Sequence, residues 1–291
     1  MSKVWFITGS SRGFGRSLAE AVLAHGDQLV ATARKPEQLA DLVQTYGDQV
    51  RIIPLDVTNY EQAQAAIQAA TEAFGRIDVV VNNAGYGNIS SIEETSIEDF
   101  RAQLDTNLWG VIHVTKAALP QLRKQGSGHI IQFSSIGGRS SAPGLAAYQS
   151  AKWGVEGFSE VLAKEVSPLG IKVTLIEPGA FRTDWAGSSM QHIEPAEPYK
   201  SSVGQLLELV REHTGKENGD PAKAAQAIIA ITNEQNPPLR LLLGSDALAI
   251  ARSVDQERLA ETEQWAKLSA STDFETKELN ERVANGFKQQ N

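Results

Sequence analysis

The sequence predicts an α/β protein with a doubly wound parallel sheet. From Lys3 to Ile176, short apolar runs rich in β-branched residues alternate with longer helical segments. Strands that are apolar along their whole length are typical of a parallel sheet covered by helices on both faces. A glycine-rich turn over residues 8–15 directly follows the first strand and supports the same class.

The predicted elements follow one another in regular order. The apolar runs predict strands over 4–8, 28–33, 50–57, 77–82, 129–135, 171–178 and 239–243. Apolar residues at helical spacing predict helices over 14–25, 36–46, 59–74, 96–124, 148–166 and 221–232. Pro36 fits a first helical turn, Gly26 and Gly75 fit positions just beyond helix ends, and Ser96 with Asp99 resembles a capping box.

The alternation stops after Pro178. Residues 181–219 mix aromatic, proline and apolar residues irregularly, and we expect them to form a lid over a substrate pocket. Trp185 and Met190 are expected to line that pocket, the alternative being that such side chains pack the lid onto the core. We expect one domain over residues 1–245 and a C-terminal extension over 246–291, with a charged helix near 246–270.

Composition excludes several classes of function. The formal net charge is -8 and no Lys/Arg-rich block occurs, so nucleic acid is not an expected partner. The absence of Cys excludes disulfides, thiol catalysis and Cys-ligated metals, and the five His show no metal-ligand spacing. The apolar run from Val4 to Ile7 is shorter than a signal peptide needs, and no stretch reaches membrane-spanning length. We therefore expect a cytoplasmic enzyme or binding protein without a metal.

The segment TGSSRGFG at residues 8–15 predicts a dinucleotide-binding loop. Gly9 fits the tight turn, Gly13 allows the backbone to approach a diphosphate, and Gly15 allows close packing of helix and strand. The N-terminus of the following helix supplies N–H donors for an anion, and Ser11 and Phe14 in the loop are expected to contact the same ligand. The alternative is a glycine-rich turn without a ligand.

The end of the second strand indicates which nucleotide is preferred. An acidic residue there would accept a hydrogen bond from the ribose 2′-hydroxyl, but the chain has Ala33, followed by Arg34 and Lys35. With Arg12 in the glycine loop, this pocket is cationic and suits a 2′-phosphate. The sequence therefore favours NADP(H), with NAD(H) as the second cofactor; alternatively, Arg34 and Lys35 are solvated charges beside a helix.

Tyr148 and Lys152 are four residues apart and share one helix face. A cation about 4 Å from the phenol, at an effective dielectric constant near 20, contributes about 4 kcal/mol, or about three pKa units. The phenol pKa would then be near 7, where general acid–base catalysis works best. Ser135, after the fifth strand, is a candidate hydrogen-bond donor to a substrate oxygen. The alternatives are a surface tyrosine beside a solvated lysine, and a serine in a turn.

Together these residues resemble the short-chain dehydrogenase/reductase family, which has a Rossmann fold. The resemblance covers about residues 3–245. It is carried by TGSSRGFG at 8–15, DV at 56–57, NNAG at 82–85, Asn107 in NLWG, Ser135, YQSAK at 148–152 and PGAFRT at 178–183. The spacing of the early glycines resembles the branch with about 250 residues, and the longer C-terminus resembles steroid- and retinol-type members.

The resemblance implies a role for each matching residue. Tyr148 would exchange a proton with the substrate oxygen, Ser135 would hold that oxygen, Lys152 would bind the nicotinamide ribose and lower the Tyr148 pKa, and Asn107 would anchor a water that links Lys152 to solvent. The residues implied in cofactor contact are Asp56, Val57, Asn83, Ala84, Gly85, Tyr148, Lys152, Pro178, Gly179 and Thr183.

The sequence thus predicts an NADP(H)-dependent carbonyl reductase or alcohol dehydrogenase. Its substrate would be a moderately large apolar ketone, aldehyde or alcohol, because the lid segment is rich in apolar and aromatic residues. The alternative is a nucleotide-binding sensor or scaffold without catalysis, which has no need of Tyr148 and Lys152. A homo-oligomer is compatible with the sequence, but the extension beyond residue 246 leaves the oligomeric state open. No signal for an activating His or acid accompanies Ser135, which argues against a hydrolase.

Overall fold

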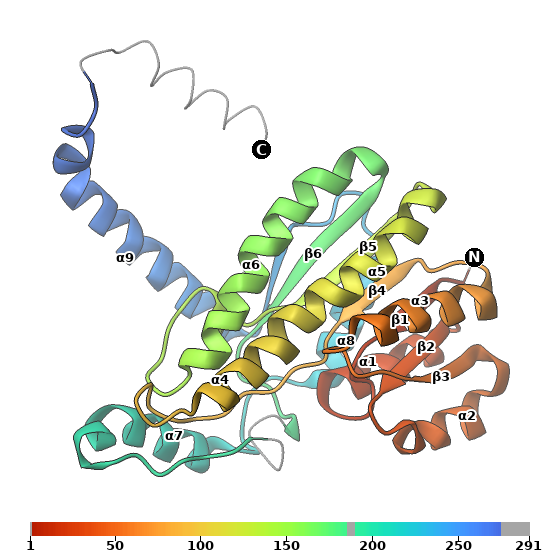
Figure 1. Cartoon of the computed structure of the whole chain (residues 1–291), viewed down its shortest axis with the longest axis horizontal. Coiled ribbons are helices and arrows are strands. Elements are labelled where there is room, and N and C mark those ends of the chain that lie inside the picture. Colours follow the sequence, from red (N-terminus) through yellow and green to blue (C-terminus); the bar gives the residue numbers. More distant parts are fainter. Residues whose placement is uncertain (1, 185–189, 275–291) are drawn as a thin grey trace.

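A seven-stranded parallel sheet forms the centre of the computed structural model, which describes residues 2–184 and 190–274. The strand order is β3-β2-β1-β4-β5-β6-β7 (Figure 1). The strands are β1 Val4–Ile7, β2 Gln28–Ala33, β3 Val50–Pro54, β4 Val79–Asn82, β5 Gly128–Phe133, β6 Ile171–Pro178 and β7 Arg240–Leu243. The order reverses between β1 and β4, and doubly wound folds bind ligands at that point, beyond the carboxyl ends of the strands. The predicted α/β class is confirmed.

Helices cover both faces of the sheet. The helices are α1 Gly13–Ala24, α2 Ala40–Tyr46, α3 Tyr60–Phe74, α4 Ile97–Leu104, α5 Gly110–Gln125, α6 Ala146–Val166, α7 Gln205–His213, α8 Pro221–Ile231 and α9 Ser245–Ala270. Apolar residues of α1, α2 and α8 form one core with the sheet, and those of α3, α5 and α6 form a second core on the other face. Alternate side chains of β1 enter the two cores: Trp5 and Ile7 face the first, Phe6 the second.

Several predicted elements are a few residues shorter than expected, and two of the differences lie beside the cavity. The strand predicted over 50–57 ends at Pro54, because the chain then turns and Asp56 accepts hydrogen bonds from Thr58. The helix predicted over 96–124 is interrupted by a π-helical turn, Asp105–Trp109, between α4 and α5. Within that turn the Asn107 amide bonds to backbone atoms outside it, which apolar periodicity does not reveal.

The last helix, α9, extends away from the sheet (Figure 1). Its first turns contribute its buried residues, Ala247 and Ala251, whereas Leu259, Trp265 and Leu268 are exposed. The helix begins just after β7, so a C-terminal helix follows the sheet as expected, while the predicted domain boundary at residue 245 stays a prediction. Among the described residues, no helix is long and apolar enough to cross a membrane.

His129 is a buried histidine on β5, away from the carboxyl ends of the strands. It is 4% exposed, its Nε2 lies 2.9 Å from Thr174 Oγ1, and its Nδ1 finds no hydrogen-bond partner in the part of the chain that the structure describes. Burial, reinforced by the charges of Lys172 and Lys3, lowers the pKa of His129 to about 3. The folded protein therefore holds this imidazole neutral.

We expect His129 to make the fold sensitive to acid. Its pKa is about 6.5 in an unfolded chain, so between about pH 6 and 4 the unfolded state binds the extra proton, and stability falls by up to about 1.4 kcal/mol per pH unit. Urea unfolding between pH 7 and 4 should show a shallower fall for His129→Gln than for the wild type. The exposed His213→Gln should keep the wild-type slope, and equal slopes for all three proteins would contradict this assignment.

Candidate active site

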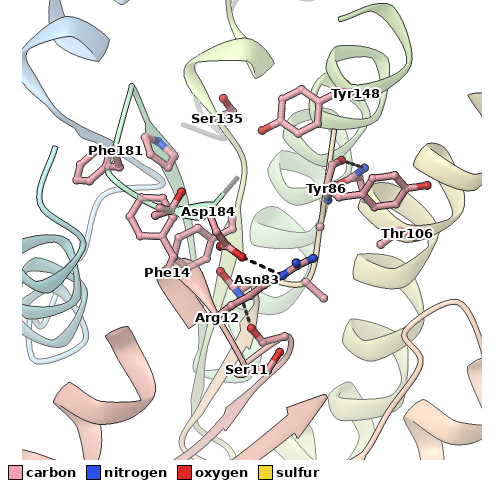
Figure 2. Close-up of a pocket in the computed structure, with 18 of the residues that line it drawn as sticks. Ser11, Arg12, Phe14, Asn83, Tyr86, Thr106, Ser135, Tyr148, Phe181 and Asp184 are labelled. Atoms are coloured by element: carbon pink, nitrogen blue, oxygen red, sulfur yellow. Dashed lines mark hydrogen bonds and ion pairs between the residues drawn. The ribbon is translucent and has the colours of Figure 1, made fainter. Parts of the chain in front are cut away.

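A cavity of about 1470 Å³ lies beyond the carboxyl ends of the strands. The loops after β1, β2, β3, β4, β5 and β6 line it, together with α6 and the end of α7. Most residues predicted from the sequence meet on its wall: Gly9, Ser11, Arg12, Gly13, Phe14, Arg34, Asp56, Val57, Asn83, Ala84, Gly85, Asn107, Ser135, Tyr148, Lys152, Pro178, Gly179 and Thr183. Figure 2 shows ten lining residues labelled.

The glycine loop and the loop after β4 are in direct contact. Gly9 and Gly13 have φ of 68° and 54°, which favour glycine. The Asn83 Nδ2 donates to the carbonyl oxygens of Thr8 at 2.9 Å and Gly9 at 3.1 Å. A Cβ on Gly15 would lie 2.2 Å from the Gly9 oxygen. Gly15 is therefore a packing residue under the loop, in the role that its spacing predicts, and is not on the cavity wall.

The basic residues beside the cavity fall into two groups. Arg34 and Lys35 follow β2, are exposed, and have no ion-pair partner among the residues that the structure describes. Arg12 lines the same cavity, and its Nε lies 3.5 Å from Asp184 Oδ2, across the glycine loop, as Figure 2 shows. Its expected part in a cationic pocket with Arg34 and Lys35 stays a prediction.

Tyr148, Ser135 and Lys152 meet at one end of the cavity. Tyr148 and Lys152 lie one turn apart on α6 and are 8% and 5% exposed. The Ser135 and Tyr148 side chains point toward each other in Figure 2, and a hydrogen bond between them lowers the Tyr148 pKa. The Lys152 Nζ donates to the Phe133 carbonyl at 2.8 Å and lies 5.6 Å from the centre of the Tyr148 ring.

The expected pKa of Tyr148 near 7 is wrong for this geometry. Burial raises the pKa of Tyr148 to about 12, more than the hydrogen bond with Ser135 lowers it. Burial also lowers the pKa of Lys152 to about 8, against the opposing charge of Glu156. Attraction between the two groups alone would lower the Tyr148 pKa, but the cost of removing each charge from water outweighs it.

Asn107 is completely buried in the π-helical turn. Its Nδ2 donates to the carbonyl oxygens of Tyr86 at 2.8 Å and Gln103 at 2.9 Å, and its Oδ1 accepts from the Tyr86 N–H at 3.1 Å. A Cβ on Gly85 would lie 2.6 Å from that Oδ1. The side chain therefore fixes the loop after β4, which carries Gly85 and Tyr86 past Lys152.

The lid segment differs in part from expectation. Met190 is 7% exposed and packs with Ile89, Val203 and Leu207 in a separate apolar cluster, so it does not reach the cavity wall. The backbone of Ile89 is hydrogen-bonded to Gln191 and Ile193. This pairing brings the Ile89 side chain next to Met190, so the two apolar side chains pack together. Trp185 lies outside the described residues.

Several lining residues were not predicted from the sequence. Tyr86, Phe181, Leu209 and Val210 also line the cavity, and the Phe181 ring packs at a tilt against Phe14 with ring centres 5.0 Å apart. Their positions in the sequence indicate this location. Tyr86 directly follows NNAG, Phe181 lies inside PGAFRT, and Leu209 and Val210 lie on the amphipathic stretch that forms α7.

Comparisons with known proteins agree with the fold and the site. The family model described as short chain dehydrogenase matches residues 3–194. Oxidoreductase BOA17 of Botryotinia fuckeliana (strain B05.10) is 53% identical over 274 residues, 94% of this chain and 100% of that protein. The chain therefore belongs to the short-chain dehydrogenase/reductase family, as its motifs predict, and is an oxidoreductase of that family.

Solved structures are similar over most of the chain. A short-chain dehydrogenase from Streptomyces avermitilis has a TM-score of 0.89 and 41% identity, covering 94% of this chain and 100% of its own. A family member from Burkholderia phymatum, solved in complex with NAD, has a TM-score of 0.76 and 26% identity, covering 86% and 92%. The Rossmann-type fold is thereby confirmed.

We expect Gly15→Ala to destabilise the fold by about 1–3 kcal/mol, because the new methyl group overlaps the Gly9 carbonyl oxygen. The thermal unfolding midpoint should fall by several degrees. Gly157→Ala, in α6 with no atom within 4 Å of the added Cβ, is the matched control and should be neutral or stabilising. Equal thermal midpoints for the two variants would show that an added methyl group at residue 15 does not destabilise the fold.

Proposed function

We propose that this protein is an NADP(H)-dependent carbonyl reductase or alcohol dehydrogenase, with the cytoplasm as its expected compartment and a moderately large apolar ketone, aldehyde or alcohol as its small-molecule substrate. One observation carries the proposal: Tyr148, Ser135 and Lys152 lie together on the wall of the cavity that the glycine loop also lines. The family and the hydride-transfer chemistry that its site residues imply are consistent with it.

The cavity fits a nicotinamide dinucleotide. Gly9 and Gly13 line the cavity with positive φ, and a side chain at either position would crowd Ala84 or Asp184. The first turn of α1 supplies N–H donors for a diphosphate. The residues that would hold the adenosine, the diphosphate and the nicotinamide are Ser11, Phe14, Arg34, Asp56, Val57, Asn83, Ala84, Gly85, Pro178, Gly179 and Thr183. When bound, the cofactor supplies or accepts the hydride.

Arg34 and Lys35 carry the preference for NADP(H). The Burkholderia phymatum structure was solved with NAD, so its fold accepts a dinucleotide without the 2′-phosphate. In this chain β2 ends at Ala33, and the two exposed cations that follow line the cavity. A guanidinium binds a phosphate through two parallel hydrogen bonds, which a neutral ribose hydroxyl does not match.

The catalytic residues suit proton donation to a carbonyl oxygen. With its pKa raised to about 12, Tyr148 stays protonated at neutral pH and acts as the proton donor during reduction. The Ser135 hydroxyl beside it donates a hydrogen bond to the same substrate oxygen. The Lys152 ammonium, held by the Phe133 carbonyl, stabilises the tyrosinate that forms. Asn107 keeps Tyr86 and Gly85 in place along the cavity.

Part of the cavity wall is apolar. Phe181, Leu209 and Val210 line it from the segment after β6 and from α7, beside the polar His213, Thr214 and Glu217. Such side chains bind hydrocarbon by removing it from water, at about 25 cal/mol per Å² of apolar surface. This lining supports an apolar substrate.

The first experiment is a titration of the purified protein with NADPH and NADH, followed by fluorescence. Acetophenone, 2-octanone and a steroidal ketone are then added with NADPH, and the loss of absorbance is followed. Tight NADPH binding with turnover of at least one ketone is the expected result. Tight binding without turnover would favour the nucleotide-binding sensor, and absence of binding would overturn the cofactor assignment.

We expect Tyr148→Phe to lower turnover by about 10² to 10⁴-fold, because it removes the proton donor and little else. The dissociation constant for NADPH should stay within about twofold of the wild-type value. Tyr60→Phe, which removes a hydroxyl outside the cavity, is the matched control. More than a tenth of wild-type turnover in Tyr148→Phe would contradict the role of Tyr148 as proton donor.

We expect Arg34→Asp to weaken NADPH binding by about ten- to a hundredfold, the effect of losing a charge-assisted hydrogen bond. NADH affinity should change much less, because NADH lacks the 2′-phosphate. Arg123→Asp, the same charge change on the exposed end of α5, should affect neither cofactor. Equal losses for both cofactors in Arg34→Asp would refute the assignment.

A further inference from the structure

Helix α9 contacts the segment that follows Ser135. The chain from Ser135 forms a short helical turn, Ile136–Gly138, and then reaches Arg139. Two residues in the middle of α9 contact Arg139: Asp255 Oδ2 lies 3.0 Å from its Nη1, and Arg258 donates to its carbonyl oxygen. The Arg258 guanidinium also lies 4.7 Å from the centre of the Trp153 ring on α6. The inner half of α9 is thus connected to the turn beside the active site.

The Arg139 side chain also pairs with Glu177 of β6. Its Nε lies 3.1 Å from Glu177 Oε1, and Glu177, near the end of β6, is completely buried. Arg240 Nε is 3.5 Å from the same oxygen and 2.9 Å from Glu156 Oε2. Burial raises the pKa of Glu177 to about 7, and the negative charge of Glu156 adds to this effect, whereas Arg139 and Arg240 oppose it. Arg139 therefore compensates a buried carboxyl group and is fixed by it in turn.

The turn between Ser135 and Arg139 has little freedom. Ser135 Oγ accepts from the Gly137 N–H at 3.0 Å, and the Ser135 carbonyl accepts from the Gly138 N–H at 2.8 Å. A Cβ on Gly138 would lie 2.6 Å from Ser134 Oγ and 3.2 Å from Glu156 Oε1. The Arg139 N–H in turn donates to the Ile136 carbonyl at 3.0 Å. Arg139 is therefore connected to the Ser135 hydroxyl through the hydrogen-bonded backbone of residues 136–138.

We infer that α9 is a positioning element for Ser135, acting through the contacts of Asp255 and Arg258 with Arg139. Helix α9 does not line the cavity itself. Besides this turn, it contacts the site's surroundings through Arg258 at Trp153 of α6 and through Asp246, which accepts from the Ala180 N–H at 2.7 Å. Of these contacts, those with Arg139 lie nearest to Ser135 along the chain. Ser135 holds the substrate oxygen beside Tyr148, and small displacements of such a group slow the chemical step strongly. This inference rests on the proposed function, and it gives the C-terminal helix a role that its exposure alone does not suggest.

The test uses the full chain and exposed residues of α9. Asp255→Asn removes the ion pair with Arg139, and Asp255→Glu is the conservative variant that should restore it. Glu257→Gln, on the same helix with the same loss of charge, is the matched control, because its carboxylate contacts Ser253 of α9 itself. Turnover of the fastest ketone from the panel, the KM for that ketone, NADPH affinity and the thermal midpoint are measured for each protein.

We expect Asp255→Asn to lower kcat by about three- to tenfold while NADPH affinity and the thermal midpoint stay nearly constant, since the pair is largely exposed. Asp255→Glu and Glu257→Gln should retain wild-type kcat. Amide hydrogen exchange in residues 136–140 should quicken in Asp255→Asn and not in Glu257→Gln.

Three results would overturn the inference. One is an unchanged kcat in Asp255→Asn together with unchanged exchange in residues 136–140. Another is an equal loss of kcat in Glu257→Gln. The third is a fall in kcat that runs parallel to losses of NADPH affinity and thermal stability, which would indicate a purely structural role. If the wild type turns over no ketone, the proposed function fails, and the exchange measurement alone then decides whether α9 holds the turn.

Discussion

The close contact of α1 with the ends of β1 and β4 is the constraint on which the site depends. Gly15 lies so near the Gly9 carbonyl and the Asn83 amide that no side chain fits between them. Asn83 bonds to the glycine loop from the other side. The sheet order reverses between these strands, so the contact closes the floor of the cavity where the fold leaves a crevice. The other lining residues can surround a ligand only while this contact closes the cavity on that side.

Burial decides the protonation of Tyr148 and Lys152, the proposed catalytic pair. It raises the pKa of Tyr148 to about 12 and lowers that of Lys152 to about 8. Attraction between the two groups acts in the opposite direction, but the Lys152 ammonium is held by the Phe133 carbonyl and not by the phenol oxygen. At neutral pH the result is a neutral phenol beside a mostly protonated amine. A neutral phenol can donate a proton, so this state suits the proposed reduction better than a phenolate would.

The sequence predicted the sheet and most of the site because both depend on local patterns. Apolar strands, glycine spacing, and Tyr148 with Lys152 on one helix face are all visible within a few residues. What the sequence did not predict depends on distant partners. The π-helical turn at Asn107 forms against Tyr86, and Arg12 pairs with Asp184 across the loop. Met190 packs on Ile89, so its apolar character indicated burial without indicating where.

Burial of Glu177 also explains why charged side chains gather near Ser135. Glu177 lies next to the last residue of β6, and a completely buried carboxyl group there destabilises the fold unless cations accompany it. Arg139 and Arg240 supply them, one from the turn after Ser135 and one from β7. Arg139 has further N–H groups to donate, and a carboxylate from α9, Asp255, accepts from one of them. The requirement to compensate one buried acid thereby connects the C-terminal helix to the active site.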